Sequence, residues 1–133
     1  MKLQGGCFCG AVRYEADGAP FNSTLCHCLD CRKTSGAPAL AWFSVMRSAL
    51  RWTGAEPRLF RSSAHALRGF CAACGASLAF FDEDWPEEID IATASLDDPE
   101  QVPPRDHTFV HSRLSWMNLR DGLPEFQRTR SEG

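Results

Sequence analysis

Seven of the 133 residues are cysteines, and they fall into three tight groups. The groups are a CxC pair (Cys7, Cys9), a CxCxxC motif (Cys26, Cys28, Cys31) and a CxxC pair (Cys71, Cys74). An odd number of cysteines cannot all pair within one chain, and a reducing compartment would not keep disulfides in any case. Clusters of this kind more often bind metals or carry out thiol chemistry. The cysteines therefore predict a small fold that is cross-linked by metal.

The CxxC pair is followed by Gly75, which favours a metal-binding turn because glycine adopts the positive φ that closes it. A redox pair is the alternative. Such pairs favour helix N-termini, whereas residues 76–81 look like a strand. A closed zinc site needs four ligands, and residues i and i+2 of an extended segment point the same way. The sequence thus predicts one structural site, rather than four unpaired core cysteines, formed by Cys7, Cys9, Cys71 and Cys74.

The CxCxxC motif offers three thiolates and no obvious fourth ligand. Three protein ligands and one open position are typical of catalytic zinc. His27 lies between Cys26 and Cys28, and alternation turns it away from any ion that they share. The other reading is a second structural site that a distant His or Asp completes. We expect Cys26, Cys28 and Cys31 to form an open zinc site at which the chemistry takes place.

The overall composition is that of an ordinary globular domain. Hydrophobic residues make up 44%, charged residues 23%, and the formal net charge is −3. This acidic balance argues against a nucleic-acid binder, which normally shows a basic surplus. No apolar run approaches the ~18 residues of a membrane span, and the N-terminus lacks the apolar stretch of a signal peptide. We therefore expect a cytoplasmic protein that binds neither nucleic acid nor membranes.

Short alternating segments predict a mainly β fold. They occur at residues 12–16, 40–45, 59–60, 66–70, 78–81, 89–91 and 108–110, and only residues 28–35 resemble a helix. Short strands at this spacing are typical of a β-sandwich or barrel-like pair of sheets. We expect a single domain of antiparallel strands over residues 1–126 and a polar tail over residues 127–133. Edge strands in so small a sheet would allow a homodimer.

Four parts of the sequence resemble those of one known family. They are residues 5–14 (GGCFCGAVRY), residues 26–37 (CHCLDCRKTSGA), residues 70–75 (FCAACG), and a C-terminal pattern at residues 95–99, 107, 112–113, 116 and 121–124. The family is that of the glutathione-dependent formaldehyde-activating enzymes, whose domain also occurs in centromere protein V. The resemblance covers nearly the whole chain and places every cysteine on a motif position.

The resemblance implies a zinc-bearing β fold similar to that of methionine sulfoxide reductase B. It implies a structural zinc ion on the four-cysteine group and a second, active-site zinc ion on the CxCxxC motif. It also implies a carbon–sulfur lyase, similar to S-(hydroxymethyl)glutathione synthase, that joins formaldehyde to the glutathione thiol or reverses that step. A non-catalytic module that carries glutathione on zinc is the alternative. The acidic balance opposes a third reading, a zinc-ribbon interaction domain.

A pocket for glutathione should contain cations, because glutathione carries two carboxylates. Arg32 and Lys33 directly follow the last cysteine of the CxCxxC motif and are the nearest candidates in the sequence. Arg68 and Arg113 are weaker candidates, for which a solvated surface position is the expectation. Trp42 could line the pocket or pack as an ordinary core aromatic.

Overall fold

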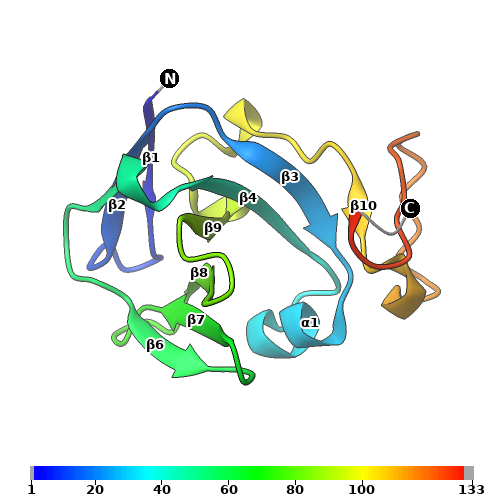
Figure 1. The fold of residues 1–133 in the computed structure, drawn as a ribbon, viewed down its shortest axis with the longest axis horizontal. Helices are drawn as coiled ribbons and strands as arrows, with labels where there is room; N and C mark the ends of the chain where they lie inside the picture. Colours follow the sequence, from blue (N-terminus) through cyan, green and yellow to red (C-terminus); the bar gives the residue numbers. More distant parts are fainter. Residues whose placement is uncertain (1, 131–133) are drawn as a thin grey trace.

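The computed structural model describes residues 2–130. Within this range the chain forms ten strands in two sheets and one α-helix (Figure 1), which confirms the predicted mainly β, single-domain fold. The strands are β1 (Lys2–Gly6), β2 (Arg13–Asp17), β3 (Phe21–Cys26), β4 (Leu40–Met46), β5 (Leu50–Trp52), β6 (Arg58–Arg61), β7 (Ala66–Phe70), β8 (Ser77–Asp82), β9 (Glu88–Ala92) and β10 (His107–Thr108). The helix α1 is Leu29–Ser35, and short 3-10 turns cover Arg47–Ala49, Thr93–Ser95, Pro99–Gln101 and Val110–Ser112.

The larger sheet has the strand order β10-β3-β4-β9-β8-β7-β6, and the smaller sheet has the order β1-β2-β5. All neighbouring strands are antiparallel except β10 and β3. Figure 1 shows the smaller sheet at one end of the molecule and the C-terminal segment beyond β3 and β10 at the other.

The two faces of the larger sheet differ in chemistry. Because side chains alternate along a strand, Phe43 and Val45 of β4 join the main core, whereas Trp42 and Ser44 lie on the opposite face. Both faces of β4 are buried, as its sequence predicts. Burial of one large apolar side chain stabilises the fold by roughly 1.5–3 kcal/mol. The most deeply buried residues of the main core, each no more than 1% exposed, include Leu3, Tyr14, Phe43, Val45, Leu78, Ile89 and Ile91.

Strand pairing aligns four residues in a row across the other face of the larger sheet, which we call the outer face. The register joins Ser44 to Asp90, Asp90 to Phe80, and Phe80 to Arg68. Neighbouring strands lie about 4.8 Å apart. The backbones of Asp90 and Arg68, two strands apart, are therefore separated by about 10 Å.

The helix α1 is held at both ends. The Cys28 sulfur, just before the helix, accepts a hydrogen bond from the Cys31 amide at 3.3 Å. At the other end Gly36 has a φ of 76° and donates its N–H to the Arg32 carbonyl at 2.7 Å. A left-handed glycine is a common helix stop. Within residues 2–130 no helix combines the length and apolar character that crossing a membrane requires.

The predicted alternating segments correspond to β2, β4 and β6 to β10, and the helix-like segment to α1. The last of these strands is shorter than predicted, because β10 ends at Thr108 and a 3-10 turn follows from Val110. Strands β1, β3 and β5 were not predicted. Their pairing partners lie elsewhere in the chain, and their own sequences lack a clear alternation of apolar and polar residues.

The C-terminal segment returns to pack beside β10. The amide of His107 donates to the Pro124 carbonyl at 2.8 Å, and the amide of Phe126 donates to the His107 carbonyl at 2.9 Å. Arg130 forms an ion pair with Asp106. The polar tail expected over residues 127–133 is described as far as Arg130, and residues 131–133 lie outside the described residues.

Candidate metal and thiol site

The four cysteines grouped by their spacing converge in the structure. Their sulfurs all lie within 4.8 Å of one another, with 3.6 Å between Cys7 and Cys9 and 3.8 Å between Cys9 and Cys71. Zinc–sulfur bonds of about 2.3 Å in a tetrahedron place the ligand sulfurs about 3.8 Å apart. The group of Cys7, Cys9, Cys71 and Cys74 therefore fits a tetrahedral metal ion.

Tight turns hold these sulfurs in place. The amide of Val12 donates to the Cys7 sulfur at 3.3 Å, and the amide of Cys74 donates to the Cys71 sulfur at 3.4 Å. Gly75 has a φ of 79°, the left-handed conformation expected for a metal-binding turn. The first pair of cysteines follows β1 of the smaller sheet, and the second pair lies between β7 and β8 of the larger sheet. The four-cysteine group therefore links the two sheets.

The CxCxxC motif forms a second sulfur cluster at the end of β3. Cys26 is the last residue of that strand, Cys28 precedes α1, and Cys31 lies in the first turn of the helix. The sulfurs lie within 4.8 Å of one another, and those of Cys31 and Cys26 are 3.3 Å apart. Within residues 2–130 no further Cys, His, Asp or Glu joins this group. It can hold a metal ion through three sulfurs.

Two side chains of the larger sheet contact the Cys31 sulfur. Trp42 Nε1 donates to it at 3.4 Å, and Arg68 Nη1 lies 3.8 Å from it. The Arg68 guanidinium also lies over the Phe80 ring, 5.0 Å from its centroid, and donates to Thr34 Oγ1 at 3.3 Å. Donors that point at a sulfur stabilise its thiolate form.

The three thiols differ in acidity. Hydrogen bonds from Cys26 and Cys31 hold the pKa of the Cys28 thiol well below its ordinary range, and the positive charge of Arg68 acts in the same direction. The hydrogen bonds with Cys28 and Cys31 raise the pKa of Cys26, and its burial adds to this effect. Cys28 is therefore the first of the three to ionise.

The three-cysteine cluster faces a cavity of about 520 Å³ on the outer face of the larger sheet. This volume is within the range of small-molecule sites. Trp42, Phe80 and Phe109 give the cavity apolar walls. Its ionisable lining residues are Asp30, His65, Arg68, Asp82, Glu88, Asp90 and Arg130, so carboxylates outnumber arginines.

Of the cations that the sequence suggested for a glutathione pocket, only one lines the cavity. Arg32 and Lys33 lie on α1 and are not among the residues that line the cavity. Arg113 forms an ion pair with Glu125 at 2.8 Å. Arg68, expected to be a solvated surface charge, is instead the cation beside the sulfurs. Its location in a predicted strand was visible in the sequence, but only the strand pairing shows that it faces Phe80 and the cysteines.

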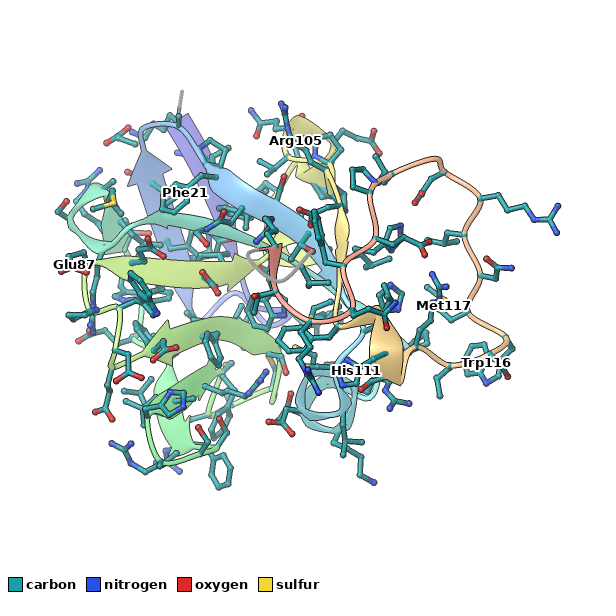
Figure 2. The ribbon with its side chains drawn as sticks, turned by 45° about the vertical axis from the view of Figure 1, so that its right-hand side comes forward. Phe21, Glu87, Arg105, His111, Trp116 and Met117 are labelled. Carbon is teal, nitrogen blue, oxygen red and sulfur yellow. The ribbon has the colours of Figure 1, made fainter. Side chains whose placement is uncertain are left out.

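A buried polar chain connects the CxCxxC motif to the C-terminal segment. His27 Nε2 lies 2.9 Å from His107 Nδ1, and His107 Nε2 lies 2.9 Å from Asp121 Oδ2. Both imidazoles are 1% exposed, and neither belongs to a sulfur cluster. His27 and His107 are 80 positions apart, so the sequence gave no indication that they meet. On the loop before Asp121, Trp116 is 70% exposed and lies at the outer edge of the molecule (Figure 2).

Comparisons with known proteins identify a family and a related fold. The sequence model of a family described as glutathione-dependent formaldehyde-activating enzyme matches residues 2–112. A protein of Halomonas elongata, whose name assigns it provisionally to that activity, is 31% identical over an alignment of 128 residues, and the match covers 90% of this chain and 82% of the relative. A crystal structure of a Rhodobacter sphaeroides protein has a similar fold, with a TM-score of 0.57 and 24% identity over 92% of this chain and 98% of that one.

Proposed function

Because the chain belongs to the glutathione-dependent formaldehyde-activating enzyme family, we propose that it is a zinc-dependent carbon–sulfur lyase. Its substrates are a small thiol of the glutathione type and an aldehyde of the formaldehyde type, which it joins into an S-hydroxymethyl adduct or releases from one. One observation carries the proposal: three cysteine sulfurs face a cavity that also presents Arg68.

Zinc is the metal that both sulfur clusters fit, because it favours tetrahedral thiolate ligation. Cys7, Cys9, Cys71 and Cys74 would form a closed, structural site. Cys26, Cys28 and Cys31 would leave one coordination position for the substrate. A zinc ion held by these residues would lower the pKa of a thiol substrate, so that its thiolate would form near neutral pH.

In the proposed step, the thiolate sulfur of the substrate forms a bond to the carbonyl carbon of the aldehyde. The π electron pair of the C=O bond moves to the oxygen, which takes a proton from water and completes the hemithioacetal. The hydroxide that remains is neutralised by the proton that the thiol released on ionising. Arg68 donates hydrogen bonds to the developing negative charge on that oxygen. Trp42 and Phe80, which lie against each other with ring centroids 6.4 Å apart, form the apolar wall behind the reacting atoms.

The test is the rate at which the zinc-loaded protein forms the adduct of glutathione and formaldehyde, followed by exchange NMR. These compounds combine without a catalyst, so the measured quantity is the excess over the uncatalysed rate. We expect an excess that disappears in Cys28→Ser, while that variant keeps the zinc ion of the four-cysteine group. If the wild type binds glutathione but gives no excess, the protein is a carrier and the lyase proposal fails.

The proposed chemistry also fits a reducing compartment. All seven cysteines are free thiols in the structure. Metal-binding thiols stay reduced in the cytoplasm, whereas an oxidising compartment favours disulfides. We therefore propose a cytoplasmic setting, in which a reduced thiol substrate is also available.

A further inference from the structure

Asp90 lies in the floor of the cavity, on the central strand of the larger sheet. Strand β9 is fourth in the seven-stranded order, and it begins just after Glu87, which Figure 2 labels. Asp90 is cross-strand neighbour to Ser44 on one side and to Phe80 on the other. Phe80 in turn lies under Arg68, which contacts the three-cysteine cluster. One aromatic ring therefore separates the Asp90 carboxyl from the cation at the sulfurs.

The structure gives Asp90 no cationic partner. Ser44 Oγ donates to Asp90 Oδ1 at 2.6 Å, but none of the ion pairs described in residues 2–130 includes this carboxyl. The two arginines of the lining are engaged elsewhere: Arg130 pairs with Asp106, and Arg68 lies beside Cys31.

The surroundings of Asp90 compensate its negative charge only in part. Burial raises the pKa of this carboxyl to about 6; the hydrogen bond from Ser44 and the charge of Arg130 oppose this effect, and the charges of Glu88 and Asp82 add to it. At neutral pH the group is therefore ionised in a partly desolvated place. A buried charge without a partner is costly, and a cation supplied by a ligand relieves that cost.

We infer that the Asp90 carboxylate binds a primary ammonium group of the thiol substrate while the cysteine cluster and Arg68 hold its sulfur end. This inference rests on the proposed function and specifies its substrate class: a thiol that carries an ammonium group several bonds from the sulfur. The backbone separation of about 10 Å between Asp90 and Arg68 equals the span of about three extended residues. The γ-glutamyl arm of glutathione, which ends in an ammonium, is of this kind.

A matched pair of thiols tests the assignment. Glutaryl-cysteinyl-glycine lacks only the α-ammonium group of glutathione. We expect zinc-loaded wild type to bind glutathione at least tenfold more tightly than this analogue, as measured by calorimetry. In Asp90→Asn that difference should vanish, because glutathione loses affinity while the analogue changes by less than twofold. The asparagine keeps an oxygen that can accept from Ser44, so the fold is retained.

Glu88→Gln is the control variant, because Glu88 lines the same cavity two residues away on β9. It should leave the preference for glutathione within about twofold. Equal loss of preference in both variants would mean that the general field of the cavity, rather than Asp90, selects the ammonium, and would overturn the assignment.

The remaining outcomes separate this inference from the proposed function. If wild type binds both thiols equally and accelerates adduct formation with both, the ammonium site is wrong and the lyase proposal stands. If Asp90→Asn weakens both thiols equally, Asp90 shapes the cavity and does not contact the ammonium. If wild type neither binds glutathione nor accelerates its reaction, both proposals fail. A preference that vanishes in Asp90→Asn and persists in Glu88→Gln supports the inference.

Discussion

At the scale of single residues, the carboxyl of Asp90 lies in surroundings that oppose its ionisation. Its pKa is raised to about 6 in the folded protein, above the ordinary value near 3.9. A raised carboxyl pKa favours the folded state at low pH, and this advantage is lost as the pH rises through the folded pKa. The residue therefore costs stability at neutral pH.

We predict that Asp90→Asn stabilises the protein more at pH 8 than at pH 5. The unfolded carboxyl is already ionised at pH 5, whereas the folded one loses its proton only near pH 6. The gain from the substitution should grow by about 1.5 kcal/mol between these pH values. Urea unfolding of wild type and Asp90→Asn at each pH measures the difference in their unfolding free energies. A difference that stays constant or shrinks from pH 5 to pH 8 contradicts the prediction.

Arg68 is the second residue whose role is open to measurement. Arg68→Met keeps an apolar stem against Phe80 but removes the donors near Cys31. We expect kcat/KM for adduct formation to fall about 100-fold, the scale of one lost oxyanion donor. Arg68→Lys, which keeps the charge, should lose less. Arg32→Met is the matched comparison, and a larger loss there would assign substrate binding to the cations of α1.

At the scale of elements, the sequence predicted strands that alternate and missed those that do not. Strand β1 reads Lys-Leu-Gln-Gly-Gly, and β3 buries the polar residues Ser23 and Thr24. Thr24 Oγ1 and Thr108 Oγ1 form a hydrogen bond at 3.0 Å, which gives the buried Thr24 hydroxyl a partner inside the protein. Strand preference depends on such partners as much as on the residues themselves, and the partner here is 84 positions away.

Two glycines, Gly5 and Gly36, allow a prediction about how tightly β1 and the end of α1 are packed. Gly5 of β1 lies opposite Tyr14 of β2, and a Cβ at this position would collide with the Tyr14 hydroxyl and the Ser95 carbonyl. Gly36 after α1 has a positive φ but open space around a Cβ. Gly36→Ala should therefore cost about 1 kcal/mol from backbone strain alone. Gly5→Ala should cost several-fold more, about 3 kcal/mol, through overpacking.

Denaturant unfolding of the two glycine variants compares these costs directly. The Tyr14 hydroxyl forms a hydrogen bond with Ser95 Oγ at 2.7 Å. Displacing the Tyr14 side chain would therefore break this hydrogen bond as well as disturb the packing. Equal destabilisation in the two variants would show that β1 yields to the added methyl group, contrary to the tight packing described here.

At the scale of the whole molecule, the two sulfur clusters should differ in what they do for the fold. The four-cysteine group links the two sheets, whereas the CxCxxC cluster lies within one local stretch of β3 and α1. Metal binding to a site that the unfolded chain lacks is folding free energy. We predict that Cys74→Ser unfolds or severely destabilises the protein, and that Cys28→Ser leaves it folded.

Zinc content per chain and thermal unfolding together check this division. The wild type should hold a tightly bound ion and a second ion that a chelator removes more readily. Cys28→Ser should lose only the chelator-sensitive one. Comparable damage to stability from both substitutions would contradict separate roles for the clusters.

The spacing of the cysteines was enough to group them as the structure does, because each group is local and glycines or short turns set its geometry. The cavity could not be predicted in the same way. Its floor takes Ser44, Asp90, Phe80 and Arg68 from four different strands. Their juxtaposition depends on register across the sheet, which no single segment specifies.

The sulfur clusters and the floor of the cavity come from different parts of the fold, and this affects which residues can be replaced independently. The sulfurs come from two tight turns, the end of β3 and the start of α1, and each is one of only three or four potential ligands in its cluster, so replacing one of them removes a large part of that cluster. The floor residues project from regular strands, where a new side chain leaves the hydrogen-bonded ladder intact. Single substitutions on β4, β8 or β9 can thus change which ligand the cavity accepts while both sulfur clusters are kept.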